Sequence, residues 1–413
     1  MSLSVELSGL QVAQTDLDTT GNNIANVNTT GFKGSTPNFT DVYATSLAGA
    51  AGTAQGLGAA ANSVSQLFTE GTISQTGNPL DVAIDGNGFF QVQTGTGILY
   101  TRDGAMQLNA NGFLTNDTGA LVMGYAAPAS GSTATQSGPL QTIQINQSNI
   151  APTATSKLSL DLNLPSSDPL VNTVTTPFSV TNPLSYNEST TSSVYDSLGA
   201  SHTLTTFFTQ VSGSGSPPKW DTHWEVSNSN GSMVASGAGA TLSFSTAGAL
   251  TAGSGTINVT IGNGANPLAI AQTFTGTTLS SLSFGVNSLS NNGAAGGQFA
   301  GLQIATNGNV VAQYTNGATK IMGTIALANF TNPQGLVATT NNDWQSTVAS
   351  GQPVTNAPGT GVLGTLQAST LEGSNVDLST QLVNLIVAQQ AYQANVQGIN
   401  VEQQDVQKLL TLQ

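Results

Sequence analysis

The sequence predicts a mixed fold, mainly β with terminal α, in which paired N- and C-terminal coiled-coil helices enclose two nested β-rich domains of the sandwich or barrel type. Three observations indicate this fold. Both chain ends carry apolar residues at alternating spacings of four and three, which is the heptad pattern of a coiled coil. The middle carries short alternating apolar runs bounded by turn-forming residues, as in β-sandwiches and barrels. Pro-, Gly- and Ser-rich joints bracket a central segment of domain size.

The first 30 residues predict a helix with a single heptad seam. Gly21 weakens this helix locally, and no proline appears before Pro37. We therefore expect the helix to end in a frayed or turn segment near residues 26–31. The seam positions are Leu3, Leu7, Leu10, Gln14, Leu17, Gly21 and Ile24.

The last 40 residues keep the same spacing over a longer stretch and predict the stronger helix. Ser374 and Asp377 have the spacing of a capping box. Glu372 and Lys408 suit the positive and negative ends of the helix dipole. The seam positions are Leu378, Leu382, Leu385, Gln389, Tyr392, Val396, Ile399, Gln403, Val406 and Leu410.

The region between the helices predicts two β-rich domains, one inserted into the other. Its alternating runs lie at residues 80–84, 89–92, 158–164, 202–208, 220–226, 257–261, 301–304 and 321–328. The Ala/Gly-rich stretch 44–63 reads as a linker or an extended covering arm. The predicted parts are a terminal helical polymerisation domain (1–30 and 366–413), a connecting segment or arm (31–70 and 350–365), an inner β domain (71–155 and 293–349) and an inserted outer β domain (156–292).

Composition argues against several classes of function. Only 6% of residues are charged, and the six basic residues are isolated, whereas nucleic-acid and anionic-membrane surfaces need clustered Lys and Arg. The chain has no cysteine and no run of 18 apolar residues, so we expect no thiolate chemistry and no membrane insertion. The N-terminus lacks the basic and apolar regions of a Sec signal. By that rule alone the protein would be cytoplasmic.

The two histidines are the first candidates for chemistry. Asp221 and His223 would lie on one face of a strand, but no cysteine or third histidine lies nearby. We therefore expect packing or surface roles for His202 and His223, and no catalytic, metal or cofactor site.

Two further pairs have a chemical and a structural interpretation. Asp81 and Asp85 could act as paired carboxylates, yet the Asp-Gly-Asn-Gly sequence that follows indicates a hairpin turn. Trp220 and Trp224 would share one face of a strand, where we expect a core role and keep a glycan-binding platform as the alternative. No nucleotide-binding, hydrolase or zinc-protease signature occurs. The sequence therefore predicts a protein that is not an enzyme.

The terminal helices predict a polymerisation element. A two-helix pair with so narrow an apolar seam is marginal in water and needs further partners. Heterologous contacts between such ends build open helical filaments, and the seam glutamines would trade stability for register. An intramolecular coiled coil that only closes the chain remains the alternative.

Residues 22–33 read NNIANVNTTGFK and resemble the signature of the flagellar axial family of rod, hook and hook-associated proteins. Further blocks similar to that family lie at 71–92, 193–208, 325–336 and 370–400, so the resemblance covers the whole chain. Distal rod proteins are shorter and hook-associated proteins lack the 71–92 block, so the inserted domain favours the hook branch. The motif residues are Asn22, Asn23, Asn26, Gly31 and Phe32.

The resemblance implies a structural subunit that self-assembles into the flagellar hook, a curved flexible tube that passes motor torque from rod to filament as a universal joint. It implies contact with itself, with rod and hook–filament junction proteins, and with the hook cap and export apparatus during assembly. It also implies an extracellular place in the hook and basal body, reached by type III export without a cleaved Sec signal. The subunit interface would comprise Leu3, Leu7, Leu10, Leu17, Ile24, Leu378, Leu382, Leu385, Tyr392, Val396, Ile399 and Val406.

Two hypotheses from other classes stay open at this point. A secreted β-rich adhesin or glycan-binding protein would suit the Thr-, Asn- and Gly-rich strands. A secreted hydrolase would need a catalytic constellation, and the sequence offers no convincing one.

Overall fold

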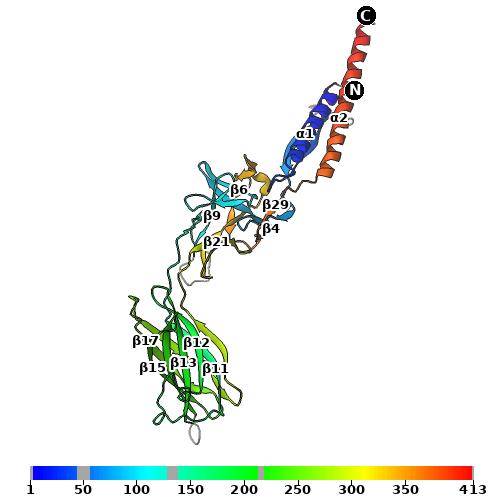
Figure 1. Ribbon diagram of the computed structural model, residues 1–413. Helices are drawn as coiled ribbons and strands as arrows, with labels where there is room; N and C mark the ends of the chain where they lie inside the picture. Colours follow the sequence, from blue (N-terminus) through cyan, green and yellow to red (C-terminus); the bar gives the residue numbers. More distant parts are fainter. Residues whose placement is uncertain (1–2, 44–55, 128–137, 213–217, 412–413) are drawn as a thin grey trace. The chain divides into compact units, whose positions relative to one another are not determined.

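The structure is a computed structural model that describes residues 3–43, 56–127, 138–212 and 218–411 (Figure 1). The chain divides into two compact units. Unit 1 comprises Met1–Gln147, Gly301–Gln313 and Thr319–Gln413, and unit 2 comprises Ser148–Ala300 and Tyr314–Ala318. Unit 2 interrupts the sequence of unit 1. The predicted division of the chain into helical, connecting and nested β segments stays a prediction.

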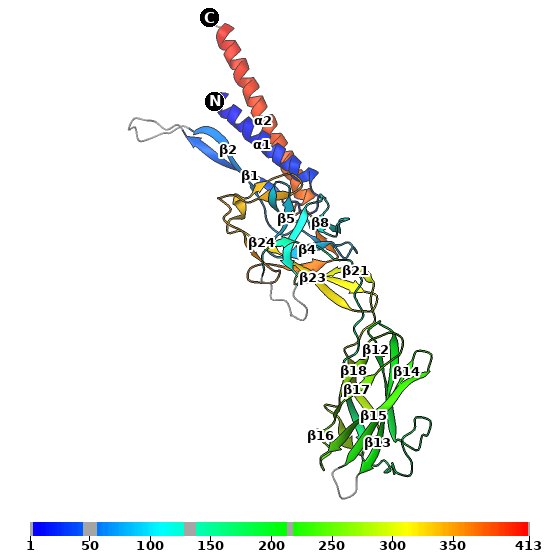
Figure 2. The ribbon, with the colours of Figure 1, turned by 90° about the vertical axis from the view of Figure 1, so that its left-hand side faces the viewer.

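Unit 1 begins and ends with two long helices, α1 (Leu3–Ala25) and α2 (Leu378–Thr411), which run side by side (Figure 2). The helices are antiparallel: Asn23, near the end of α1, bonds to Gln381, near the start of α2, while Gly9 lies against Asn395. After Ala25 the chain turns through residues 26–31. The two terminal helices and the turn are therefore confirmed.

A β-hairpin follows the turn and lies along α1 (Figure 2). Its strands, β1 (Ser35–Tyr43) and β2 (Gly56–Gln66), pair antiparallel, and the amide of Ala59 donates to Oγ of Ser8 at 3.3 Å. Of the two interpretations of 44–63, the extended arm fits residues 56–63, and the linker is wrong there because β1 and α1 supply tertiary partners. Residues 44–55 lie outside the described residues.

The β domain of unit 1 is built on a 13-stranded sheet whose main path is β21-β22-β23-β9-β5-β6-β26-β25. The pairs β28–β4 and β29–β3 form two further small sheets. The bounds are β3 (Ile73–Gln75), β4 (Val82–Asp85), β5 (Phe89–Thr94), β6 (Gly97–Thr101), β7 (Met106–Leu108), β8 (Leu114–Asn116), β9 (Leu121–Ala126), β10 (Gln141–Thr142), β21 (Phe299–Ile304), β22 (Asn309–Tyr314), β23 (Thr319–Ile325), β24 (Leu327–Asn329), β25 (Val337–Ala338), β26 (Asp343–Gln345), β27 (Val354–Asn356), β28 (Thr365–Ala368) and β29 (Thr370–Glu372), with a short 3-10 helix η1 (Pro333–Gly335).

An aromatic core fixes the end of the hairpin to this β domain. Phe89, Tyr100, Phe330 and Trp344 are buried, and their rings meet edge to face with centroids 4.7 to 6.0 Å apart. Phe68, just after β2, joins them at 5.6 Å from Phe89. Aromatic pairs of this geometry add specificity beyond the area that they bury. The connecting segment is therefore packed against the sheet.

Unit 2 is a β-sandwich of two five-stranded sheets. In one, β11 runs parallel to β18 and β19 and antiparallel to β20. The other is antiparallel, in the order β12-β13-β14-β15-β16. The bounds are β11 (Lys157–Pro165), β12 (Glu188–Tyr195), β13 (Ser201–Ser212), β14 (Lys219–Asn228), β15 (Met233–Phe244), β16 (Leu250–Ala252), β17 (Ser254–Val259), β18 (Leu268–Thr273), β19 (Thr278–Ser280) and β20 (Gly285–Asn291).

Alternate side chains of both sheets fill the core of unit 2. Leu158, Leu160, Leu162 and Leu164 of β11 are at most 1% exposed and belong to one apolar cluster with residues of β13, β14 and β15. Full burial of such a side chain contributes about 1.5–3 kcal/mol. Unit 2 therefore has a hydrophobic core of its own.

Each of the eight predicted runs overlaps an observed strand, namely β4, β5, β11, β13, β14, β17, β21 or the adjacent pair β23 and β24, although residues 80–81 and 260–261 lie outside β4 and β17. The hairpin expected after Asp85 is wrong. β4 pairs with β28, and β5 pairs with β6, β9 and β24, so residues 86–88 form a turn between two sheets. A returning C-terminal strand supplies the partner that a local hairpin would have supplied.

The predicted capping box of α2 is also wrong. Asp377 caps the helix itself, because its Oδ1 accepts the amide of Thr380 at 2.7 Å and its carbonyl accepts the amide of Gln381 at 3.0 Å. An N-cap residue makes these two bonds. Ser374 lies before the helix, and its Oγ accepts the amide of Val376. The spacing of the pair matched the motif, but the helix begins three residues later than that motif requires.

Candidate functional site: the terminal helix pair and the Glu372 clamp

α2 contacts α1 through one stripe of its surface. The helices approach closely, since a Cβ on Gly9 would lie 2.6 Å from Oδ1 of Asn395 and one on Gly398 would lie 2.5 Å from Oε2 of Glu6. The pairs Asn23–Gln381, Gly9–Asn395 and Glu6–Gly398 share one antiparallel register. Moving back by a number of residues in α1 corresponds to moving forward by the same number in α2. The stripe, named here the inner stripe, consists of residues that are partly or fully buried at heptad spacing: Gln381, Leu385, Ala388, Tyr392, Asn395, Ile399 and Glu402.

A second apolar stripe lies on the other side of α2, at about 100° of helix rotation per residue. Leu382, Val383, Ile386 and Val387 are 44%, 60%, 53% and 57% exposed. We name these four residues the outer stripe. Contiguous exposed apolar side chains mark interaction surfaces more often than isolated ones do.

α2 also extends past α1. The register of the pair places Leu3, the first residue of α1, opposite Val401, whereas α2 continues to Thr411. Val406 and Leu410 in this extension are 51% and 69% exposed. The last heptad positions of α2 therefore lie beyond the described residues of α1.

The predicted seam residues are found in three situations. Leu10, Leu17, Ile24, Leu385, Tyr392, Val396 and Ile399 are partly buried, and Leu7, Leu378, Leu382 and Val406 are exposed. The side chain of Leu3 lies outside the described residues. The role of this set as a subunit interface stays a prediction.

The predicted seam glutamines do not take part in the contact between α1 and α2. Gln14, Gln389 and Gln403 are exposed, and Ala388 and Glu402 face α1 instead. A heptad pattern with apolar residues on two adjacent tracks does not fix which track meets a given partner. The close approach of α1 favours the track with the small Ala388.

The axial-motif turn after α1 is held by two asparagines. Asn23 is 3% exposed, accepts the amide of Ser35 at 2.9 Å and donates to its carbonyl at 2.8 Å. Asn26 donates to the carbonyl of Asn22 at 3.0 Å. Asn23 and Asn26 thus satisfy backbone groups at this helix end, while Asn22 is exposed.

Gly31 lets the turn touch the β domain. Its φ is +68°, and a Cβ would lie 2.7 Å from the amide nitrogen of Asp103, so both the backbone conformation and the space require glycine. Its amide donates to the carbonyl of Glu372 at 2.8 Å. Phe32 beside it is partly buried. The turn is thereby anchored to the segment that leads into α2.

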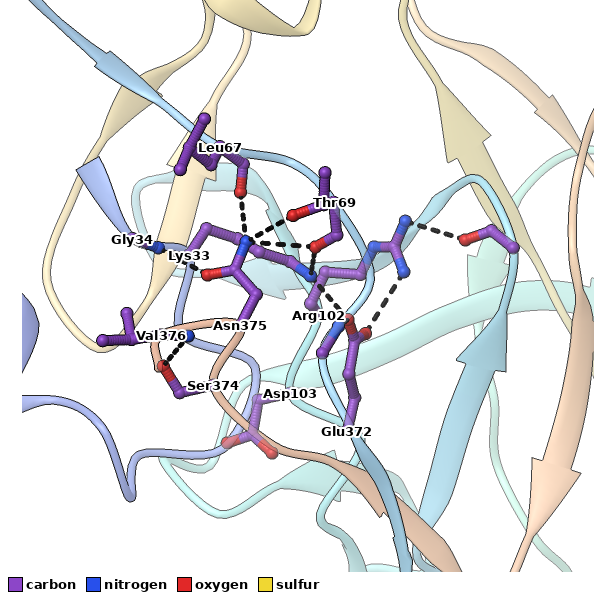
Figure 3. A network of polar contacts seen from close by, with 12 residues as sticks. Lys33, Gly34, Leu67, Thr69, Arg102, Asp103, Glu372, Ser374, Asn375 and Val376 are labelled. Carbon is purple, nitrogen blue, oxygen red and sulfur yellow. Dashed lines mark hydrogen bonds and ion pairs between the residues drawn. The ribbon is translucent and has the colours of Figure 1, made fainter. Parts of the chain in front are cut away.

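A buried carboxylate lies where these segments meet (Figure 3). The Glu372 side chain is 0% exposed. Its Oε1 lies 2.5 Å from Nζ of Lys33 and accepts the amide of Gly71 at 2.9 Å, and its Oε2 lies 3.2 Å from Nη1 of Arg102. We name Lys33, Arg102 and Glu372 the Glu372 clamp.

The two cations of the clamp reach other parts of unit 1. Lys33 also donates to the carbonyl of Thr69 at 2.7 Å. Arg102 donates to the carbonyl of Gly86 at 3.0 Å, and its guanidinium lies 5.3 Å from the ring centroid of Phe89. The clamp thus joins the turn after α1, the end of the hairpin, the β domain and the strand before α2.

Asn375 makes a parallel connection beside the clamp (Figure 3). Its Oδ1 accepts the amide of Gly34 at 2.8 Å, and its Nδ2 donates to the carbonyls of Leu67 at 2.7 Å and Thr69 at 3.2 Å. Asn375 therefore joins three of the four segments that the clamp joins: the turn after α1, the end of the hairpin and the segment before α2. One amide side chain therefore repeats the pattern with neutral groups.

Burial dominates the electrostatics of the clamp. It lowers the pKa of Lys33, and the adjacent Glu372 carboxylate opposes that shift. A buried ion pair adds little net stability over apolar residues, but removal of one partner costs about 3–5 kcal/mol. The clamp therefore contributes geometry more than it contributes stability.

Two carboxyls of the same β domain hold protons unusually strongly. Burial raises the pKa of Asp103 to about 6, helped by the charges of Asp117, Asp343 and Asp81 and opposed by the amide of Ala105. Burial likewise raises the pKa of Asp343 to about 6, opposed by a hydrogen bond from Thr101. Both groups titrate near physiological pH.

The two histidines pack against neighbouring side chains of unit 2. His202 is 4% exposed, and its Nε2 lies 3.1 Å from Oδ2 of Asp196. Burial raises the pKa of Asp196, but hydrogen bonds from Asn263, His202 and two backbone amides outweigh it and lower the pKa to about 2. His223 stacks on Phe178 with centroids 4.1 Å apart, and burial lowers its pKa.

The remaining candidate pairs are separated or buried. Trp220 and Trp224 are 0% and 7% exposed in the core of unit 2, so the glycan-binding platform is wrong. Asp81 accepts a hydrogen bond from Asn78 at 2.8 Å, while Asp85 is exposed at the end of β4. The described residues contain no group of three or more His, Cys, Asp or Glu placed to hold a metal ion. No helix in the described ranges has the length and apolarity to cross a membrane.

Sequence reasoning missed the clamp and Asn375. Lys33 ends the axial motif, Arg102 appears as an isolated base, and Glu372 appears as a helix-dipole residue. The one feature of the sequence that could have pointed to the clamp is its small number of basic residues. The chain has six, and two of them are buried. Cations rarely lie in a protein core unless they are paired.

This architecture defines a class of structural subunit, the flagellar rod-and-hook proteins, and family models match it along the chain. The matches are the flagella basal body rod protein family at residues 3–33, the flagellar hook protein FlgE/F/G D1 domain at 83–161, the flagellar basal body protein FlaE D2 domain at 163–294, and the C-terminal family of the basal body rod FlgEFG proteins at 367–412.

Full-length relatives narrow the class. The chain is 38% identical to the flagellar hook protein FlgE of Escherichia coli strain K12 over 423 residues, with all of both chains covered, and 30% identical to FlgE of Borreliella burgdorferi, with 100% and 99% covered. The chain belongs to the flagellar hook protein family, a structural family, and acts as a hook subunit in the flagellum. A crystal structure of Helicobacter pylori FlgE2 shares the fold, with a TM-score of 0.56 and 14% identity over 72% of this chain and all of that one.

Proposed function

We propose that copies of this chain polymerise into the hook through the terminal helices, and that the outer stripe and the extension of α2 are the contacts. The outer stripe carries the proposal. Its Leu382 is 44% exposed, while the polar Gln381 beside it faces α1. A helix pair that formed only to close the chain would bury its more apolar track. The seam residues predicted from sequence belong to this proposed interface.

The same proposal covers the properties of the assembled tube. Heterologous contacts along one helix surface generate an open helical polymer. Such a polymer would be a curved, flexible tube that transmits torque as a universal joint. It would meet rod and hook–filament junction proteins at its ends, and the hook cap and export apparatus during growth. The subunit would leave the cell by type III export without a cleaved signal and would catalyse no reaction.

Tube formation by purified protein tests the proposal. A chain without residues 1–30 and 370–413 should form no tubes under conditions in which the full chain does, as seen by electron microscopy. A sharper variant replaces Val383 and Ile386 by Ser, which changes only exposed side chains and should leave the melting temperature of the monomer within about 2 °C while it abolishes tubes. Val348→Ser with Val354→Ser, at exposed sites of the β domain, is the matched control. Normal tubes from the helix variant would refute the proposed interface.

A further inference from the structure

Heptad seams leave more than one alignment of two helices open. A shift of seven residues returns the same heptad positions to contact and displaces one helix by about 10 Å. α2 has 34 residues and α1 has 23, so such a shift still leaves α1 covered. The helices alone therefore do not specify the register in which Glu6 meets Gly398.

The Glu372 clamp continues that register beyond the helix ends. The one-for-one correspondence of the helices, extended through the turn, places Lys33 opposite Leu371, the residue before Glu372. Lys33 in fact pairs with Glu372, and the amide of Gly31 donates to the carbonyl of the same residue. The Lys33–Glu372 contact before α2 and the contacts between α1 and α2 therefore follow the same residue-to-residue alignment, to within one residue.

The segments that connect the clamp to the helices are short and are fixed by hydrogen bonds. Ala25 ends α1 and Leu378 begins α2, a few residues from Lys33 and Glu372. Hydrogen bonds from the amide of Ser35 to Oδ1 of Asn23 and from the amide of Gly34 to Oδ1 of Asn375 hold these connections in place. A displacement of about 10 Å cannot be absorbed without breaking them or opening the clamp.

We propose that the Glu372 clamp sets the register of the terminal helix pair, with Lys33, Arg102 and Glu372 as positioning residues. The buried charges accept one geometry only, because a shifted alignment separates the carboxylate from its cations inside a site that excludes water. The register then decides how far α2 extends past α1. The inference concerns the single chain and does not depend on the proposed assembly interface.

Disulfide trapping tests this in the full-length monomer, because the chain has no cysteine. Glu6→Cys with Gly398→Cys reports the observed register. Glu6→Cys with Ala391→Cys or with Asp405→Cys reports a shift of one heptad in either direction. In an otherwise unaltered chain we expect only the first pair to crosslink within the monomer band of a non-reducing gel. With Glu372→Gln added, the ratio of shifted to native crosslinks should rise by about tenfold or more.

Two further variants separate positioning from folding. Lys33→Met, Arg102→Met and Glu372→Leu together remove the charges without leaving any of them uncompensated, so the β domain should stay folded while shifted crosslinks appear. Asp196→Asn, which disturbs a buried carboxylate of unit 2, should leave the crosslink ratio unchanged. If the apolar triple variant is folded by circular dichroism and keeps the native crosslink pattern, the clamp does not set the register.

Discussion

Unit 1 and unit 2 are each stabilised by a different kind of internal contact. Unit 2 comes almost entirely from one continuous stretch, Ser148–Ala300, and its core is an apolar sandwich. Unit 1 joins segments hundreds of residues apart, and the point where they meet is a buried carboxylate with two cations. Apolar burial is non-directional, whereas a buried ion pair tolerates little displacement. The chain thus places directional contacts where its two ends must be aligned and non-directional ones where a compact body suffices.

The largest expected effect is on unit 1. Glu372→Gln leaves Lys33 and Arg102 buried without their anion and should destabilise unit 1 by about 3–5 kcal/mol. Hydrogen exchange measured by mass spectrometry should show faster exchange in α1, α2 and β29, with β11 to β20 unchanged. Lys157→Gln, at an exposed lysine, is the control. Equal loss of protection in both units would show that the clamp does not stabilise unit 1 in particular.

A truncated core side chain in unit 2 should destabilise unit 2 and leave unit 1 unchanged. Leu160 is 1% exposed, and Leu160→Ala should destabilise unit 2 by about 3 kcal/mol through lost burial and the cavity left behind. Trp220 and Trp224 lie in unit 2 and Trp344 in unit 1, and the chain has three tryptophans. In a Trp344→Phe background, the fluorescence transition should therefore move to lower temperature. An unmoved transition would mean that unit 2 does not depend on its own core.

The two units should respond to pH in opposite directions. In unit 1 the pKa of Asp103 and of Asp343 is raised to about 6, so their contribution to stability is fully present below about pH 4 and is lost as pH rises through 6. In unit 2 burial lowers the pKa of His223, so its contribution is present above pH 6.5 and is lost as pH falls below that value. Asp196, with a pKa of about 2, contributes above pH 4 and loses that contribution as pH falls through 2.

Calorimetry between pH 8 and pH 5 checks this pH response. The transition of unit 1 should rise in temperature with acidification, and that of unit 2 should fall. Asp343→Asn should flatten the response of unit 1 and leave unit 2 as it was. Parallel movement of the two transitions would show that these carboxyls and His223 do not govern the pH dependence.

The smallest expected effect is at the helix cap. Asp377→Ala removes the side-chain acceptor of the Thr380 amide and should slightly lower the stability of unit 1. Asp377→Asn retains an acceptor and should cost less. The measurement is the midpoint of urea unfolding of unit 1. A loss equal for the two substitutions would assign the effect to the charge of Asp377 and the helix dipole in place of the cap.

Much of the helix pair was predictable from the sequence, and one aspect was not. Heptad spacing correctly marks Leu385, Tyr392 and Ile399, which recur every seventh residue and face α1. It does not choose between Ala388 and Gln389 for the remaining position, because that choice depends on how closely the partner approaches at Gly9. Periodicity reports which residues are apolar and leaves open which neighbour they meet.

The clamp and the hairpin lay beyond the reach of local patterns. Lys33 and Glu372 are far apart in sequence, and the pairing of β29 with β3 brings the C-terminal segment next to Lys33. β2 is rich in Ala and Gly and has weak intrinsic preference for a strand, yet it pairs with β1 along its whole length. In both cases tertiary partners decide the structure, and a single sequence does not identify them.

The burial of Lys33 and Arg102 has a practical consequence for protease digestion. Trypsin cleaves after lysine and arginine, and the other four basic residues of the chain, Lys157, Lys219, Lys320 and Lys408, are all exposed. Peptide bonds 33–34 and 102–103 become substrates only when the clamp opens. The ratio of cleavage at those two bonds to cleavage at the exposed lysines therefore measures how often the clamp opens and the two ends of the chain separate.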